Sequence, residues 1–155
     1  MNSKIPNSRN ILIAVDESEN AKRAVLYVKE LLAGLSGFHI KLITIIPEPS
    51  EDYFASDGER KIWIEEKNAS AQSILEEYGT FLRVSGFGDD EITFQVLTKD
   101  CASIAECILE EQEKLSCGTV VIGRRGISKK EEFIFGSTSS KILHTARDCA
   151  VWVIE

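Results

Sequence analysis

Long hydrophobic runs are absent from this 155-residue sequence, and no apolar segment approaches the ~18 residues that a membrane-spanning helix needs. The first nine residues, MNSKIPNSR, also lack the apolar stretch of a secretory signal peptide. We therefore expect a cytoplasmic protein without a membrane partner. Cysteine is scarce, and its four positions form no Cys-x-x-Cys pair: Cys101, Cys107, Cys117 and Cys149. This spacing argues against a zinc site or a disulfide framework and predicts reduced thiols.

Residues suited to metal binding or nucleophilic catalysis are also few. Neither histidine, His39 or His144, has a Cys, Asp or Glu partner at a convincing ligand spacing. Ser137 and His144 are not three or four residues apart, as a hydrolase pair on one helix face would be. A Walker-type Gly-Lys-Ser/Thr sequence is missing too. The sequence therefore predicts no catalytic residue.

Basic charge is in deficit, because 18 basic residues stand against 25 acidic ones and the net charge is −7. Such a chain is a poor non-specific partner for nucleic acid or an anionic membrane. The exception is segment 123–141, where five basic and two acidic residues give +3 and leave −10 for the rest. A basic segment on an acidic protein favours one small anionic ligand over a polyanion.

The sequence does contain a clear pattern of apolar residues. Their spacing changes along the chain between the two-residue period of strands and the roughly 3.6-residue period of helices. Ser18 is the expected N-cap of the first helix, and the polar segment 47–58 is expected to be a loop. Strands are predicted at 10–16, 39–46, 91–98, 118–123 and 150–154, and helices from Ser18 to about Leu35, at about 59–85 and 102–115, and from near Ser137.

This alternation predicts a single α/β domain over residues 10–155, with a parallel sheet, helices on both faces and a flexible N-terminus at 1–9. Ligands of such sheets bind beyond the carboxyl ends of the strands, where the strand order switches. That edge would hold Asp16, 44–47, 98–101 and the segment from Gly123. Cys101 is accordingly the best candidate for an oxidation sensor, although a small buried hydrophobe is the commoner role of cysteine.

Segment 120–140, VVIGRRGISKKEEFIFGSTSS, runs from an apolar strand through Gly123, Gly126 and Gly136 to the start of a helix. Glycines let backbone N–H groups approach an anion, and a helix N-terminus offers further unpaired N–H groups. Hydroxyl groups at 137–139 would add donors. Local chemistry alone favours a phosphate site and a surface loop with capping serines equally.

The spacing G-x2-G-x9-G-S, formed by Gly123, Gly126, Gly136 and Ser137, resembles the nucleotide motif of the universal stress protein family. The opening strand ILIAVDES and the ending GSTSSKILHTARDCAVWVIE are similar to the family's first strand and its last helix and strand. The likeness covers about residues 10–154. It implies a Rossmann-like five-stranded parallel sheet in the order 3-2-1-4-5, ATP as ligand, and a homodimer through strand 150–154.

The resemblance also implies which residues contact ATP. Ala14, Val15 and Asp16 would lie near the adenine and ribose, and the backbone of Ile45 would contact adenine. The ribose and phosphates would be held by Ile122, Gly123, Arg124, Gly126, Gly136, Ser137, Thr138 and Ser139. Asp16 is alternatively a magnesium ligand or a helix-capping acid. The chain departs from the family at Lys99-Asp100-Cys101, where Gly-Asp-Pro is common, and this change affects the pocket rim.

The resemblance therefore implies an ATP-binding, cytoplasmic regulatory module of the stress response. One alternative is an enzyme that hydrolyses ATP slowly or phosphorylates its own serines at 137–140, although no clear general base accompanies them. Another is a nucleotide-free interaction domain. A receiver domain is disfavoured, because Asp100 could imitate a phosphoacceptor but no lysine follows the fifth strand.

Overall fold

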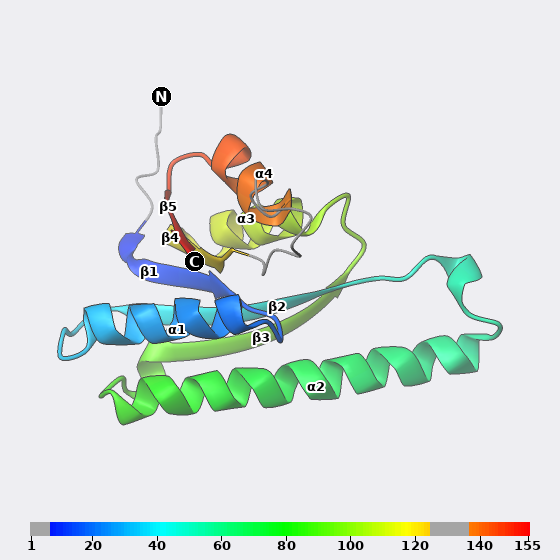
Figure 1. Ribbon diagram of the computed structural model, residues 1–155, viewed down its shortest axis with the longest axis horizontal. Coiled ribbons are helices and arrows are strands. Elements are labelled where there is room, and N and C mark those ends of the chain that lie inside the picture. The colour runs from blue at the N-terminus through cyan, green and yellow to red at the C-terminus, as the bar shows by residue number, and fades with distance from the viewer. Residues whose placement is uncertain (1–6, 125–136) are drawn as a thin grey trace.

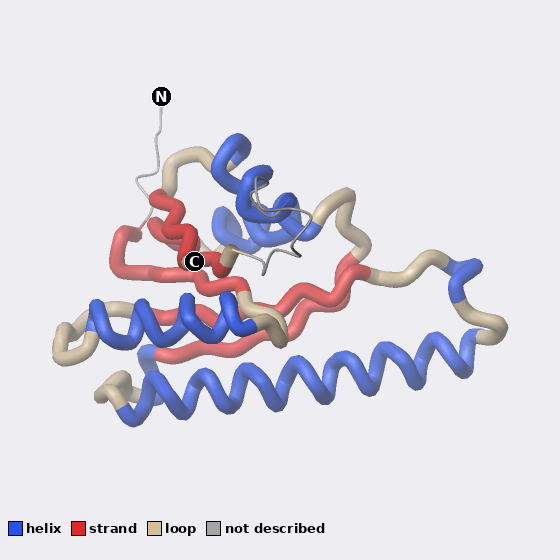
Figure 2. The backbone as a smooth tube through the Cα atoms, viewed as in Figure 1, coloured by secondary structure: helices blue, strands red, loops and turns tan. Residues whose placement is uncertain are grey.

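The computed structural model describes residues 7–124 and 137–155. Its strands form one parallel sheet in the order β3-β2-β1-β4-β5, with helices on both faces (Figures 1 and 2). This confirms the predicted fold class and strand order. The elements are β1 (Asn7–Ala14), α1 (Glu19–Leu32), β2 (His39–Pro47), η1 (Glu51–Tyr53), α2 (Asp57–Val84), η2 (Asp89–Glu91), β3 (Ile92–Lys99), α3 (Ile104–Lys114), β4 (Cys117–Gly123), α4 (Ser137–Thr145) and β5 (Ala150–Ile154).

The first strand begins earlier than its apolar pattern indicates. Asn7 pairs with Cys117 of β4, and the Arg9 guanidinium donates a hydrogen bond to the Ser36 carbonyl at 3.0 Å. Residues 7–9 are thus part of the sheet, where the sequence predicted a flexible segment. The reason is that backbone pairing at the exposed start of a strand requires no apolar side chains. β1 also ends at Ala14, so Asp16 lies in the turn that leads into α1.

Serine side chains cap three of the helices. The hydroxyl oxygens of Ser18, Ser56 and Ser103 each accept the backbone N–H three residues further on, at 3.2 Å. The prediction for Ser18 is therefore confirmed. Ser56 starts α2 inside the predicted loop 47–58, which also contains the short helix η1. None of the described helices, the 28-residue α2 included, is long and apolar enough to cross a membrane.

Two apolar layers hold the sheet between its helices. Alternate side chains of β1 point to opposite faces: Ile11 and Ile13 join the core beneath α1 and α2, while Leu12 joins the core beneath α3 and α4. All three are at most 1% exposed. Because both faces of β1 are buried, the carboxyl end of this central strand is held firmly in place.

Two of the four cysteines are not reduced thiols. Cys101 and Cys107 form a disulfide, with their Cα atoms 6.0 Å apart, so the prediction was wrong for this pair. The chain turns back after β3 and brings the first turns of α3 within the roughly 4.4–6.8 Å that a disulfide allows. Spacing in the sequence gives no sign of that turn. Cys117, which is buried, and Cys149 are free, as predicted.

Candidate functional site

A pocket of about 430 Å³ opens at the carboxyl edge of the sheet. It lies where β1 separates β2 from β4, the point at which the strand order reverses. The lining residues come from three strand ends and from all four long helices: Ala14, Val15, Asp16, Glu17, Ser18, Ala21, Thr44, Ile45, Ile46, Pro47, Trp63, Lys67, Ser70, Ala71, Ile74, Ile104, Ile108, Ile122, Gly123 and Thr138.

The pocket brings together most of the predicted site residues that the structure describes. Those that line it are Ala14, Val15, Asp16, Ile45, Ile122, Gly123 and Thr138. Ser137 and Ser139 belong to the same first turn of α4 as Thr138 but are not lining residues, and Ser139 is only 3% exposed. Gly126 and Gly136 lie outside the described residues.

Arg124 follows β4 but does not line the pocket. Its backbone N–H donates to the Ile154 carbonyl at 2.7 Å, which extends the pairing of β4 with β5. Its guanidinium lies 3.3 Å from the carboxylate of Glu155. The side chain that the family resemblance assigned to ribose or phosphate is therefore paired with Glu155.

The turn between β1 and α1 is fixed by a small set of hydrogen bonds. A carboxylate oxygen of Asp16 accepts the Ser18 N–H at 2.8 Å, so Asp16 braces the turn, whereas Ser18 itself is the N-cap of α1. The Thr44 hydroxyl donates to the Val15 carbonyl at 3.0 Å and is buried. The described residues contain no group of three Asp, Glu, His or Cys side chains that could hold a metal ion. A magnesium role for Asp16 stays a prediction.

Gly123 has a packing role that the sequence did not reveal. A Cβ atom at this position would overlap the Asn20 carbonyl and lie 2.7 Å from the Ala21 nitrogen. Only glycine lets α1 approach the end of β4 this closely. The absence of a side chain therefore brings the N-terminal turn of α1 to the pocket, in addition to any contact with a ligand.

Helix α2 supplies a wall that the sequence analysis missed. Trp63, Lys67, Ser70 and Ile74 follow one another at helical spacing and line the pocket together. The Lys67 ammonium lies 5.7 Å from the centre of the Trp63 ring, within cation–π distance. The i, i+4, i+7, i+11 spacing was the available signal, but it does not say what the helix face meets.

The pocket combines apolar walls with few polar groups, and its volume falls in the range of roughly 300–1,000 Å³ typical of small-molecule sites. Isoleucines from β2, α3 and β4 face it, and charged side chains enter from two sides only. Asp16 and Glu17 carry the negative charge, and Lys67 is the one cation among the described lining residues. Such a pocket is suited to a flat, largely apolar group with a polar end.

A parallel sheet of this order, with a pocket at its switch point, defines the class of doubly wound α/β ligand-binding domains. Within that class, the universal stress protein family model matches residues 7–155, nearly the whole chain. The protein therefore belongs to the universal stress protein family, as the glycine motif and both flanking segments indicated.

Solved structures of the family have the same fold at low sequence identity. The universal stress protein UspA from Lactobacillus plantarum is 17% identical, with a TM-score of 0.79 over 96% of this chain and 99% of that one. A universal stress protein from Archaeoglobus fulgidus is 22% identical, with a TM-score of 0.72 over 94% and 98%. The A. fulgidus protein in complex with dAMP is 19% identical, with a TM-score of 0.62 over 94% and 97%. A search of curated protein sequences gave no match.

Proposed function

We propose that this universal stress protein is an ATP-binding regulatory module of the stress response. The observation that carries the proposal is the pocket at the carboxyl edge, which joins the ends of β1, β2 and β4 to the first turn of α4. The glycine motif begins at Gly123, on the wall of this pocket. A nucleotide placed there would have its base among apolar side chains and its phosphates toward the motif.

The adenine end of the site is supported by the apolar walls. Val15, Ile45 and Ile122 offer the surfaces against which a flat base can pack, and the related A. fulgidus structure was solved in complex with dAMP. In the proposed arrangement the backbone at Ile45 contacts the base. The acidic turn at Asp16 lies toward the ribose or binds magnesium that accompanies the phosphates.

The phosphate end is supported by the start of α4. Thr138 lines the pocket in the first turn of this helix, where unpaired N–H groups and the positive end of the helix dipole favour an anion. Gly126, Gly136 and the flanking serines would complete the cradle. The pairing of Arg124 with Glu155 leaves the charge contribution to the other basic residues of the segment.

The test is calorimetry with ATP on Gly136→Val, because a branched side chain would block close approach of the backbone to the phosphates. We expect ATP binding to be lost while the fold is retained. Gly58→Val is the matched control, since a Cβ at Gly58 meets only the Ser56 hydroxyl, at 3.8 Å. Adenosine should bind the parent protein far more weakly than ATP. Unchanged ATP binding by Gly136→Val would favour the nucleotide-free interaction domain.

We further propose that the protein acts in the cytoplasm as a homodimer joined through β5. The edge position of β5 in the sheet supports the dimer. The absence of a membrane-spanning helix among the described residues is compatible with the location. Fractionation of cells that express the tagged protein tests the compartment, and recovery in the membrane fraction would contradict it.

A further inference from the structure

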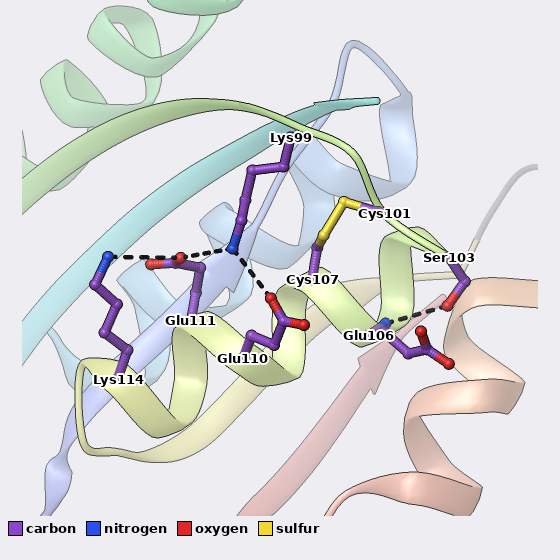
Figure 3. A network of polar contacts seen from close by, with 8 residues as sticks. All are labelled: Lys99, Cys101, Ser103, Glu106, Cys107, Glu110, Glu111 and Lys114. Carbon is purple, nitrogen blue, oxygen red and sulfur yellow. Dashed lines mark hydrogen bonds and ion pairs between the residues drawn. A yellow bond between two sulfur atoms is a disulfide. The ribbon is translucent and has the colours of Figure 1, made fainter. Parts of the chain in front are cut away.

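The disulfide between Cys101 and Cys107 closes a short loop at the rim of the pocket, which we call the cysteine loop (residues 101–107). Figure 3 shows it bridging the β3–α3 connection and the first turn of α3. Cys101 is partly exposed, whereas Cys107 is only 2% exposed. A thiol from solution can therefore reach the sulfur of Cys101 more easily than that of Cys107.

The cysteine loop contains part of the pocket wall. Ile104 lies inside it and Ile108 follows it directly, and both line the pocket. The loop also contains Ser103, whose hydroxyl caps α3 by accepting the Glu106 N–H at 3.2 Å (Figure 3). The position of the first turn of α3 thus sets the position of two pocket side chains.

Beside the loop, a separate set of contacts ties β3 to α3. The Lys99 ammonium lies 3.1 Å from the Glu110 carboxylate and 3.3 Å from that of Glu111, which is 1% exposed (Figure 3). Hydrogen bonds to Glu110 and Glu111 raise the pKa of Lys99. They hold the middle of α3 whether or not the disulfide is present.

Residues 100–102 lie between these contacts and the capped first turn of α3, and the disulfide attaches them to the helix. Within the described residues, no hydrogen bond or ion pair joins residues 100–102 to the rest of the molecule. Besides the peptide chain itself, the Cys101–Cys107 bond is the one covalent link between this connection and the start of α3. Its loss would free the connection while leaving the rest of the helix in place.

We propose that Cys101–Cys107 is a reversible thiol–disulfide site, and that its oxidised form holds the pocket wall in the shape that binds nucleotide. This inference rests on the proposed nucleotide site. The reducing substrate is a dithiol, either a small molecule or a thioredoxin-like protein. Disulfides that form in reducing compartments are commonly of this reversible, sensing kind.

The exchange proceeds in two balanced steps. A thiolate of the dithiol attacks the sulfur of the partly exposed Cys101, the S–S bond breaks, and Cys107 leaves as a thiolate that takes up a proton. The second thiol of the reductant then attacks the mixed disulfide, closes its own disulfide and releases Cys101 as a thiol. Two electrons pass from the dithiol to the protein. A small-molecule disulfide such as oxidised glutathione reverses both steps.

The oxidised form is expected to bind nucleotide more tightly. A pocket wall that is already ordered loses less conformational freedom when the ligand arrives. In the reduced form, binding must also order the connection and Ile104. We expect the dissociation constant for ATP to rise about fivefold or more on reduction, the size of a modest coupling between two sites.

The test is calorimetry with ATP on the full chain, oxidised with oxidised glutathione or reduced with dithiothreitol, after mass spectrometry has counted the alkylated thiols. We expect two thiols after oxidation, four after reduction, and the weaker binding in the reduced form. Cys101→Ser should bind like the reduced parent protein in both conditions. Cys149→Ser is the matched control, because it removes a free thiol and should keep the response to reductant.

Hydrogen exchange supplies a readout that needs no nucleotide. Amides of residues 102–108 should exchange faster after reduction, while those of Glu110–Lys114 should not change. Equal ATP affinity of the two forms would overturn the inference and leave the nucleotide site standing. Absence of ATP binding by both forms would overturn the proposed function together with the inference.

Discussion

Tyr78 carries a phenol group in surroundings that disfavour its ionised form. The side chain lies in the core between α1 and α2 and is 4% exposed. Burial, followed by the nearby charges of Glu77, Asp16 and Glu19, raises the pKa of Tyr78 to about 12. The phenolate would be poorly solvated and would face three carboxylates, so the folded state holds the proton more firmly than the unfolded chain does.

This shift predicts an alkaline loss of stability. The pKa of Tyr78 is about 12 in the folded protein, against an ordinary value of 10.0. The stabilisation of the folded state that comes from the protonated phenol is therefore complete below pH 10 and is lost as the pH rises through 12. The loss should be on the order of 2 kcal/mol in the free energy of unfolding. Tyr78→Phe keeps the aromatic ring but removes the hydroxyl group that titrates. The free energy of unfolding of this variant should therefore fall less over the same pH range. Urea unfolding of both proteins from pH 9 to pH 12 measures the difference, and parallel curves would contradict the assignment.

Single residues also show where sequence reasoning succeeds. The prediction that Ser18 caps α1 depends on the neighbouring residues alone, and the structure confirms it. The disulfide and the packing role of Gly123 depend on chain segments that are distant in the sequence or on the direction of a turn. No local pattern contains that information, because both arise from the way in which whole elements meet.

Among the elements, α2 shows how helix packing depends on one small residue. Gly79 faces β3, and a Cβ atom there would overlap the ring of Phe94. The glycine lets the C-terminal half of the helix lie directly on the sheet. The buried residues of α2 all come from this half: Ala71, Leu75, Tyr78, Gly79 and Leu82.

Gly79→Ala should therefore destabilise the protein, although alanine is normally the better helix former. We expect a loss of roughly 1–3 kcal/mol from the forced displacement of Phe94. Gly58→Ala in the same helix is the control, because its Cβ makes only an ordinary contact with the Ser56 hydroxyl and the substitution should stabilise by up to about 1 kcal/mol. Thermal and urea unfolding of the two variants decide the matter. A Gly79→Ala protein as stable as the parent would show that α2 does not rest on Phe94.

Across the whole molecule, the arrangement of layers explains why half of the pocket was predictable. The ends of β1, β2 and β4 must lie together in any parallel sheet of this order, and the family resemblance assigned Ala14, Ile45 and Ile122 to those ends. The wall made by Trp63 and Lys67 depends on the angle at which α2 crosses the sheet. Figure 1 shows this helix running well beyond the strands, so its period alone cannot tell which turns face the site.

The edges of the sheet decide how the molecule can assemble. β5 lies at one edge, and the carbonyl of its last residue, Ile154, accepts a hydrogen bond from Arg124. Because backbone groups alternate in direction along a strand, those of Val151 and Val153 point away from β4. Their unpaired N–H and carbonyl groups are a template for another strand, and a second β5 running antiparallel across a two-fold axis would satisfy them.

We predict that Val151→Pro converts the proposed homodimer into a monomer. Proline removes the outward N–H of the edge, and a position whose N–H faces away from the sheet tolerates it, so the monomer should lose only about 1–2 kcal/mol. Trp152→Pro is the matched control, since it removes a donor directed toward β4 and should destabilise the monomer itself. Light scattering at high micromolar concentration measures the assembly, and urea unfolding measures the stability. A parent protein that is monomeric at that concentration, or a Val151→Pro protein that stays dimeric, would show that β5 is not the interface.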